Sequence, residues 1–301
     1  MLTSQVIARL LSRVDTLVMI QVASPATAPS VGALLQHWRK ARRMSQLELA
    51  NRADISPRHL CFVETGRSKP SRAMVLLLAT TLDVPLRERN VLLLAAGFAP
   101  MFDESSLDAP ALATVRTALE AILRQQEPFP AIVLNRQWDI VHGNDAAKRF
   151  FAYLLGWSKR PKTVNVARLM FDPRGLRPRV RNWNAAAVAL LHRIHREAVG
   201  GVNDAKTSQL LEDILAYPNA RDLLREFERD KPLVPVLPIS YVRAAGEPVF
   251  NYFSTVTTLG TAQDITLQEL RIESFFPADA ATERHARAFS AGLRGAASAA
   301  R

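Results

Sequence analysis

The sequence has 301 residues, 48% of them hydrophobic, and a formal net charge of +11, so it is long enough and apolar enough to fold as two globular domains. Its single cysteine, Cys61, excludes an intrachain disulfide and a Cys-based zinc finger or iron–sulfur site supplied by this chain alone, which fits a reducing cytoplasm. Residues 31–98 carry 11 Lys and Arg against 5 Asp and Glu and residues 99–280 carry 22 against 21, so the charge that could attract a polyanion is concentrated in the first segment.

Residues 1–29 are expected to form a flexible N-terminal extension. They contain an apolar run at 17–23 followed by SPATAPS, a pattern with a faint likeness to a secretion signal. Arg9, Arg13 and Asp15 interrupt the apolar residues before it, and the run is far shorter than the roughly 20 apolar residues that a membrane span needs. We therefore expect no membrane association, and an over-long start of the reading frame is the alternative to a native extension.

Two short helices in close succession are predicted between residues 45 and 66. Ser45 begins a capping box with Glu48, in which the Ser hydroxyl accepts from a backbone N–H and the Glu side chain reaches back. The second helix has Ser56 as its N-cap and Pro57 at its first position, and Gly66 supplies the left-handed residue that ends it. Because so few residues separate the two helices, they must cross at a steep angle, which is the geometry of a helix-turn-helix.

Three flanking helices complete a predicted five-helix domain over residues 30–98. The first runs from Ser30 to Arg43, the fourth begins after its cap Ser71, and the last lies between Pro85 and Gly97. The basic segment is therefore expected to be an all-helical domain.

The outer face of the helix that begins at Ser56 is the candidate contact surface. Leu60 and Val63 face inward by their spacing, which leaves the opposite positions at the surface. These surface positions are Arg58, His59, Phe62 and Thr65. An aromatic ring beside a guanidinium is unusual on a purely solvated face, so we expect this surface to bind a partner.

These residues resemble the XRE or phage-repressor type of helix-turn-helix, and the resemblance covers about residues 32–98. The pattern of that family stands here as Arg39, Ser45-Gln46-Leu47-Glu48-Leu49-Ala50, Ser56-Pro57-Arg58-His59 and Glu64-Thr65-Gly66-Arg67-Ser68-Lys69-Pro70. The resemblance implies that phosphates are contacted by Gln46, Thr65, Arg67 and Lys69, and that base edges are reached from the helix capped by Ser56 through Arg58, His59 and Phe62. It also implies an internal ion pair between Arg39 and Glu64.

The chemistry of these side chains agrees with the implied DNA contacts. A guanidinium binds guanine O6 and N7 with two hydrogen bonds, and an apolar ring packs on a thymine methyl. Helix N-termini and basic loops bind phosphate. One departure is Pro57, which stands where many relatives carry Gln and cannot donate to DNA, so base reading must shift to Arg58 and its neighbours. The plainer alternative is that Arg58 and His59 are solvated and that Arg39 and Glu64 form an ordinary surface pair.

The near-neutral segment is predicted as a helical linker over residues 99–126 and an α/β domain over residues 127–280. A basic flexible tail is predicted over residues 281–301. The expected elements are a hairpin at 130–144 with its turn at Asn135-Arg136, helices from 144, at 163–170, at 181–199 and at 207–229 with a break at Pro218, and strands at 234–242, 247–259 and 266–276. In the last strand Leu270, Ile272 and Phe276 occupy one side and Glu269, Arg271 and Glu273 the other. The pattern favours an antiparallel sheet with helices on one face.

A hairpin, a helical middle and three closing strands look like a PAS-type sensor domain. Four strings are similar to the ligand-binding domain of the MmyB-like regulators, namely FDPRGLRP (171–178), NW (182–183), TTLG (257–260) and LQELRIESFFP (267–277). With the basic segment, the resemblance spans about residues 32–280. It implies a transcription factor whose PAS-like domain holds an apolar, fatty-acid-like molecule. The predicted fold class is α+β in two domains, an all-α five-helix helix-turn-helix domain followed by a PAS-like α/β sensor domain with an antiparallel sheet.

Aromatic side chains of the second domain are the candidate pocket residues. They are Trp138, Phe150, Phe151, Trp183, Phe250, Tyr252 and Phe253, and an arginine among Arg174, Arg177 and Arg181 could pair with a ligand carboxylate. Aromatic residues at such spacing also build ordinary cores, and arginines also lie on ordinary surfaces, so the sequence leaves both interpretations open. No metal and no cofactor other than the apolar ligand is expected.

Three alternatives concern the second domain. A heme-binding sensor would need an inward histidine; His192 and His195 fall away from the apolar stripe of their helix and are expected to be solvated, which leaves His142 as the candidate ligand. An enzyme would need a catalytic motif, and the chain has no Gly-x-Ser-x-Gly, no phosphate-binding glycine loop and no His-Glu-x-x-His. The third alternative is a dimerisation or partner module without ligand.

The function that these patterns favour is sequence-specific regulation of transcription by a cytoplasmic, nucleoid-associated homodimer. The helix that begins at Ser56 would enter the major groove at each half of a palindromic operator, with half-site centres one helical turn, ~34 Å, apart or a multiple of it. A small apolar ligand would change the relative placement of the two DNA-binding heads by binding one arrangement more tightly than the other.

Overall fold

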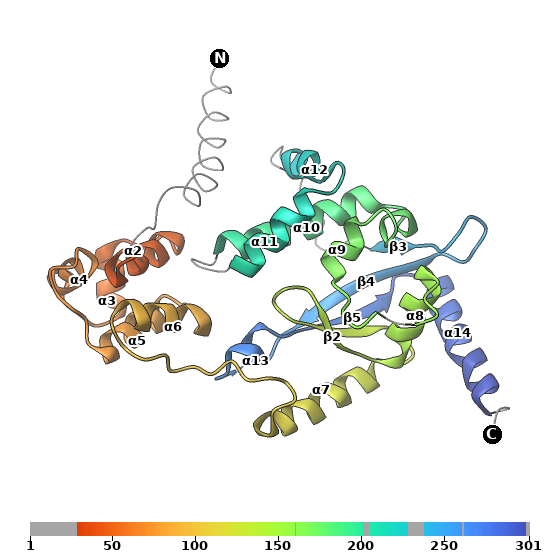
Figure 1. The fold of residues 1–301 in the computed structure, drawn as a ribbon, viewed down its shortest axis with the longest axis horizontal. Helices are drawn as coiled ribbons and strands as arrows, with labels where there is room; N and C mark the ends of the chain where they lie inside the picture. The colour runs from red at the N-terminus through yellow and green to blue at the C-terminus, as the bar shows by residue number, and fades with distance from the viewer. Residues whose placement is uncertain (1–28, 160, 201–204, 228–237, 261, 299–301) are drawn as a thin grey trace, which may run out of the picture. The chain divides into compact units, whose positions relative to one another are not determined.

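The computed structural model describes residues 29–159, 161–200, 205–227, 238–260 and 262–298. The described chain divides into two compact units, the first made of residues 29–84 and 89–100 and the second of residues 85–88 and those from 101 onward (Figure 1). The division near residue 100 lies close to the boundary predicted after residue 98. The predicted N-terminal extension lies outside the described residues except for Pro29.

Five helices occupy residues 31–95, as the sequence predicted. They are α2 Val31–Ala41, α3 Gln46–Arg52, α4 Pro57–Glu64, α5 Arg72–Thr81 and α6 Leu86–Ala95. The first four begin at serine caps, each of which accepts a hydrogen bond from the backbone N–H three residues on, namely Ser30, Ser45, Ser56 and Ser71. The capping box at Ser45 is only half formed, because the carboxylate of Glu48 accepts from Arg52 at 2.8 Å.

Close approach of α2 and α4 fixes the helix-turn-helix. Leu35, Leu49 and Leu60, one from each of α2, α3 and α4, have no exposed surface. Gly32 allows the backbones to meet, since a Cβ at this position would lie 2.5 Å from the carbonyl oxygen of Glu64. The position of α4 is therefore set by packing against α2 as well as by its own cap.

A five-stranded antiparallel sheet organises the second unit. Its strands are β1 Ala131–Leu134, β2 Ile140–Gly143, β3 Ile239–Tyr241, β4 Phe250–Thr257 and β5 Arg271–Pro277, in the spatial order β2-β1-β5-β4-β3. The predicted hairpin is present, but its connection runs from Asn135 to Asp139 and places Trp138 in the left-handed region at φ 67°. Part of the strand predicted at 234–242 lies outside the described residues.

Both faces of the sheet are covered, which corrects the prediction of one covered face. Successive strand residues point to opposite faces. Ile132 and Leu134 of β1 therefore join a core with helices α8 to α12, which lie between residues 145 and 227 (Figure 1). Ala131 and Val133 join a second core with α7 Ala113–Gln125 and α13 Ile265–Glu269. At β1 neither face is exposed, because every residue of this strand is buried.

The predicted helical linker at 99–126 is a structural layer of the second unit. Within it, a 3₁₀ turn Pro110–Leu112 leads into α7 Ala113–Gln125. Leu112, Leu119 and Leu123 are buried in the same cluster as Val133 and Ile272. The reason is the apolar stripe of α7, which requires a partner surface and finds it on the sheet.

The helices of the other face follow the prediction. They are α8 Asp145–Leu155, α9 Val166–Phe171, a 3₁₀ turn Arg177–Arg179, α10 Trp183–Gly200, α11 Ala205–Leu215 and α12 Ala220–Phe227. Pro218 lies in the break between the last two, as expected for a residue without a backbone N–H. No helix in the part of the chain that the structure describes is both long and apolar enough to cross a membrane.

Two C-terminal segments differ from the prediction. The strand expected at 266–276 begins with a helical turn, α13 Ile265–Glu269, which Asp264 caps, and β5 follows it. Glu269 therefore lies on a helix, and Arg271 is buried. The tail predicted to be flexible contains helix α14 Ala280–Ser298, which packs on β4 and β5 and buries Ala286 in the core.

Candidate nucleic-acid surface and ligand cavity

The predicted DNA-contact residues cluster on α4 and the loop that follows it. Ser56 uses its hydroxyl oxygen as the helix cap and accepts from the N–H of His59 at 3.1 Å. Arg58 is exposed in the first turn of α4, and His59 is half-buried. The loop exposes Thr65, Arg67 and Lys69. The structure thus brings the predicted base-reading and phosphate-binding side chains to neighbouring positions.

The ring of Phe62 lies beside two guanidinium groups. The Cζ atom of Arg58 is 5.4 Å from the ring centroid, and that of Arg67 is 6.0 Å from it. Cation–π attraction at exposed sites is worth roughly 0.5–1 kcal/mol. This half-buried ring therefore orients one arginine predicted to read bases and one predicted to bind phosphate, which explains an aromatic residue on this face.

The loop after α4 has a defined backbone. Gly66 has a φ of 74°, and the N–H groups of Arg67 and Ser68 both donate to the carbonyl of Phe62, at 2.8 and 3.1 Å. The hydroxyl of Thr65 donates back to the last turn of α4 at 2.7 Å. Because these bonds already hold the loop backbone, that backbone would lose little conformational entropy if the loop bound a phosphate.

Arg39 and Glu64 form the predicted ion pair, and it is buried. Nε and Nη2 of Arg39 donate to the two carboxylate oxygens at 2.7 and 2.9 Å, and Nε2 of Gln46 adds a third bond at 2.8 Å. Burial alone would raise the pKa of Glu64, but the hydrogen bonds from Arg39 and Gln46 outweigh it and hold that pKa below its ordinary value. The alternative of an ordinary surface pair is wrong. The side-chain amide of Gln46, which is predicted to contact phosphate, donates one hydrogen bond to Glu64.

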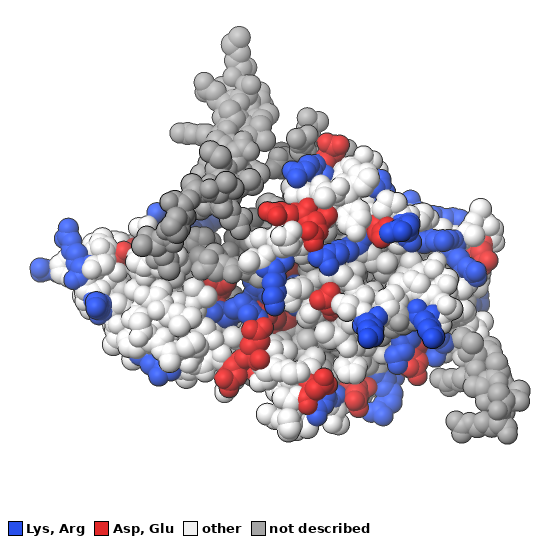
Figure 2. Space-filling model, in the orientation of Figure 1, with Lys and Arg blue, Asp and Glu red and all other residues white. Residues whose placement is uncertain are grey.

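Surface charge differs between the two units in Figure 2. Lys and Arg are interspersed with Asp and Glu over the second unit, as the near-neutral balance of residues 99–280 requires. Around the elements that Figure 1 labels α3 and α4, the same view shows Lys and Arg with little acidic surface beside them. This distribution suits attraction of a polyanion to the first unit.

Three of the aromatic residues predicted to line a pocket pack against one another. The ring centroid of Phe150 lies 5.6 Å from that of Phe250 and 5.4 Å from that of Tyr252, both edge-on. The void beside these three side chains is about 10 Å³, room for one water at most. They form a close-packed core, which is the plainer of the two interpretations that the sequence left open.

The other predicted pocket residues have structural partners. Trp138 lies beside Arg193 and Arg271, whose Cζ atoms are 4.7 and 4.6 Å from the centroid of its ring, and its indole N–H donates to Glu197 at 3.1 Å. Trp183 is buried and donates to the carbonyl of Met170 at 2.8 Å. Arg181 is exposed. Trp138 and Trp183 are therefore held by protein groups in this structure, and the role of these residues in ligand binding stays a prediction.

A separate apolar cavity of about 130 Å³ lies between the β1–β2 hairpin and α8. Its lining is Ile132, Ile140, Gly143, Ala147, Lys148, Phe151, Ala152, Trp157 and Val164. Of the aromatic residues considered from the sequence, Phe151 is the one in this lining. The signal that could have found the cavity is the set of small residues Gly143, Ala147 and Ala152, which leave space where a strand meets a helix.

The histidines do not favour a heme site. His142 is exposed and lines a polar groove at the edge of the sheet, outside the apolar cavity. His192 and His195 are half-buried on α10, which corrects the expectation that they are solvated; burial, with the charges of Arg196 and His195, lowers the pKa of His192. Among the described residues, no group of three or more His, Cys, Asp or Glu is placed to hold a metal ion.

A helix-turn-helix unit followed by an α/β unit with an apolar cavity defines a DNA-binding regulator that carries a ligand-binding domain. Residues 30–92 match the helix-turn-helix domain family, and residues 115–289 match the MmyB-like transcription regulator ligand binding domain. The chain belongs to the family of MmyB-like transcription regulators, since the second match alone covers more than half of it. That match begins inside α7 and ends inside α14, which agrees with the packing of both helices on the sheet. Comparison with curated proteins found no matching relative.

Proposed function

We propose that the protein is a sequence-specific transcriptional regulator of the XRE type that places α4 in the major groove of DNA. The observation that carries the proposal is the exposed arrangement of Arg58 and Arg67 around Phe62 at one face of a serine-capped helix. Arg58 is suited to bind guanine with two hydrogen bonds, whereas Arg67 and Lys69 in the ordered loop are suited to bind phosphates.

The regulator acts as a homodimer on a palindromic operator. Two copies of α4 related by two-fold symmetry read two half-sites whose centres are one helical turn, ~34 Å, apart or a multiple of it. Because its target is chromosomal DNA, the protein works in the cytoplasm in association with the nucleoid. Both families that match the chain describe DNA-binding or ligand-binding domains, which supports a regulator rather than an enzyme.

The second unit acts as a PAS-like sensor of a small apolar molecule with an acidic head, such as a fatty acid. The cavity of about 130 Å³ is close to the 150 Å³ of an apolar protein cavity known to bind benzene, so it accommodates about six carbons as it stands. A longer acyl chain requires the cavity to enlarge. Lys148, exposed and part of the lining, supplies an ammonium for a carboxylate head in place of its present partner Asp145.

The test of DNA recognition is an unbiased selection of duplex oligonucleotides with the purified protein. Enrichment of a palindromic sequence, with an affinity that falls steeply with salt concentration, is the expected result. Binding without sequence preference, or no binding, rules out the proposed role of α4.

The second candidate for the α/β unit is a dimerisation or partner module without ligand. The dense packing of Phe150, Phe250 and Tyr252 favours it, because the void beside these three rings is too small for a guest. Native mass spectrometry of the purified protein separates the two candidates, since a co-purifying mass of lipid size supports the sensor and a bare chain supports the module.

A further inference from the structure

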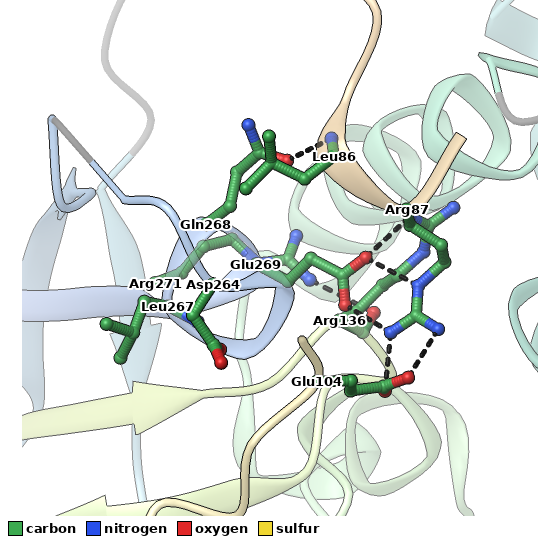
Figure 3. Close-up of polar contacts among 9 residues, drawn as sticks. All are labelled: Leu86, Arg87, Glu104, Arg136, Asp264, Leu267, Gln268, Glu269 and Arg271. Atoms are coloured by element: carbon green, nitrogen blue, oxygen red, sulfur yellow. Dashed lines mark hydrogen bonds and ion pairs between the residues drawn. The ribbon is translucent and has the colours of Figure 1, made fainter. Parts of the chain in front are cut away.

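The first N–H of helix α6 is bound by a side chain from a distant part of the chain. The residue before this helix is Pro85, which has no side-chain acceptor, in contrast to the serine caps of the four preceding helices. The N–H of Leu86 instead donates at 2.7 Å to the side-chain oxygen of Gln268, 182 positions further along the chain (Figure 3). Unsatisfied N–H groups at a helix start are costly, so α13 supplies the cap that the local sequence lacks.

The next residue of α6 is bound by the neighbour of Gln268. Nε and Nη2 of Arg87 donate to the carboxylate of Glu269 at 2.8 and 2.9 Å, and the same guanidinium donates to Glu104 at 2.8 and 2.5 Å (Figure 3). The side chain of Glu269 is only 14% exposed. A two-bond pair that is largely withdrawn from water is stronger and more directional than a surface pair.

On its other side α13 is fixed to the sheet. Leu267 and Leu270 are buried in the core beneath α7, and Arg136 donates to Glu269 at 2.9 Å. The residue after Leu270 is Arg271, whose buried guanidinium donates to the backbone carbonyl of Arg136 at 3.1 Å and pairs with Glu197 of α10. The β1–β2 connection therefore meets α13 through Arg136, and Arg271 at the start of β5 binds the same connection.

The same hairpin lines the apolar cavity. Ile132 of β1 and Ile140 of β2 contribute to the cavity wall, and Arg136 lies in the connection between these two strands. A guest that moved the hairpin would act on the side chain that holds Glu269. The first turn of α6, residues 86–88, belongs to the second unit, and the helix continues into the first unit from Arg89.

We infer that Gln268 and Glu269 are positioning residues for DNA recognition, because they hold the first turn of the last helix of the helix-turn-helix region. The inference rests on the proposed function. In this inference α13 is the element through which the β1–β2 hairpin at the cavity acts on α6. A guest can act in this way only if it binds one position of the hairpin more tightly than another.

The test compares Gln268→Ala and Glu269→Gln with a matched control in the full-length protein. Glu212→Gln serves as the control, since it removes an exposed carboxylate of α11 far along the sequence from α13. Removal of the cap is expected to speed amide hydrogen exchange at Leu86 to Arg89 about fivefold and to weaken binding to the selected duplex by a similar factor. The control should change neither quantity.

A second variant separates positioning from simple loss of folding. Glu269→Asp keeps the charge and should recover part of the duplex affinity, while exchange within β1 and β5 stays as in the wild type. Faster exchange at α6 with unchanged duplex affinity would overturn the inference, and so would unchanged exchange. If the wild type showed no duplex preference, the proposed function would fail by itself, and the exchange at α6 alone would then decide whether α13 holds this helix.

Discussion

Arg39 and Glu64 stand 25 positions apart in sequence and join α2 to α4 through two hydrogen bonds between their side chains. A third nitrogen of the same guanidinium donates to the carbonyl of Met44 at 2.9 Å. One buried cation therefore fixes α2, the turn after it and the end of α4. This arrangement determines the direction in which α4 presents Arg58.

Replacing the anion of this pair should destabilise the first unit strongly. Glu64→Gln leaves Arg39 buried without an opposite charge, and the expected cost is about 3 kcal/mol. Glu48→Gln is the matched control, because it breaks an exposed pair with Arg52 worth about 0.5 kcal/mol or less. Amide hydrogen exchange in α2 and α4 measures the local free energy of unfolding. Equal effects of the two substitutions would contradict the importance of burial.

The same pair predicts a pH dependence. The pKa of Glu64 is lower in the folded protein than its ordinary value, because the bonds from Arg39 and Gln46 overcome the opposing effect of burial. A lowered carboxyl pKa gives stability that is present above the unfolded pKa, roughly 4.3, and is lost as the pH falls through the folded pKa. Protection of the α4 amides against exchange should therefore fall on acidification below about pH 4, and this fall should be smaller in Glu64→Gln. An identical acid response in both proteins would exclude Glu64 as its source.

The parts of the fold that the sequence predicted are those with local signals. Ser30, Ser45, Ser56 and Ser71 mark helix starts by hydrogen bonds that span three residues, and all four form. The prediction for the α13 segment is wrong because alternating charged and apolar residues in LQELRIE have the period of a strand, while the cap at Asp264 starts a helix.

The ligand site was less predictable, because it depends on contacts between distant residues. Trp138 looks like a pocket residue in isolation, and only the fold places Arg193 and Arg271 beside its ring. The cavity arises instead where residues on β2 and α8 have little side-chain volume, and such small residues are a weak signal in sequence. The ion pair between Arg39 and Glu64 was found because it belongs to a family pattern.

Arg58 and Lys69 should differ in what their loss does to DNA binding. Arg58→Ala is expected to cost about 1–3 kcal/mol on the selected duplex and to relax preference at one base pair, since we propose that the guanidinium reads a base edge. Lys69→Ala should weaken all duplexes alike and reduce the salt slope by about one unit. Titrations of selected and scrambled duplexes at several salt concentrations provide the measurement. The same pattern for both variants would refute this division of roles.

Phe62 should contribute to specificity through its ring. Phe62→Leu keeps an apolar side chain but removes the aromatic face beside Arg58 and Arg67, and discrimination between selected and scrambled duplexes should fall about threefold to fivefold. Phe62→Tyr keeps the face and should retain most of the discrimination. If Leu and Tyr at this position discriminated equally well, the ring would have no orienting role.

Filling the apolar cavity should weaken ligand binding and leave DNA binding intact in the absence of ligand. Ala152 is half-buried in the cavity lining, and Ala152→Leu places three additional carbons in a space of about 130 Å³. With octanoate as the probe, its affinity measured by titration calorimetry should fall at least about tenfold, because the guest and the new side chain compete for one volume. Ala118→Leu, an exposed change on α7, adds the same volume outside the cavity and should leave octanoate binding unchanged. Retained octanoate affinity in Ala152→Leu would place the guest elsewhere in the protein, and the cavity at the β1–β2 hairpin would lose its role as the sensor site.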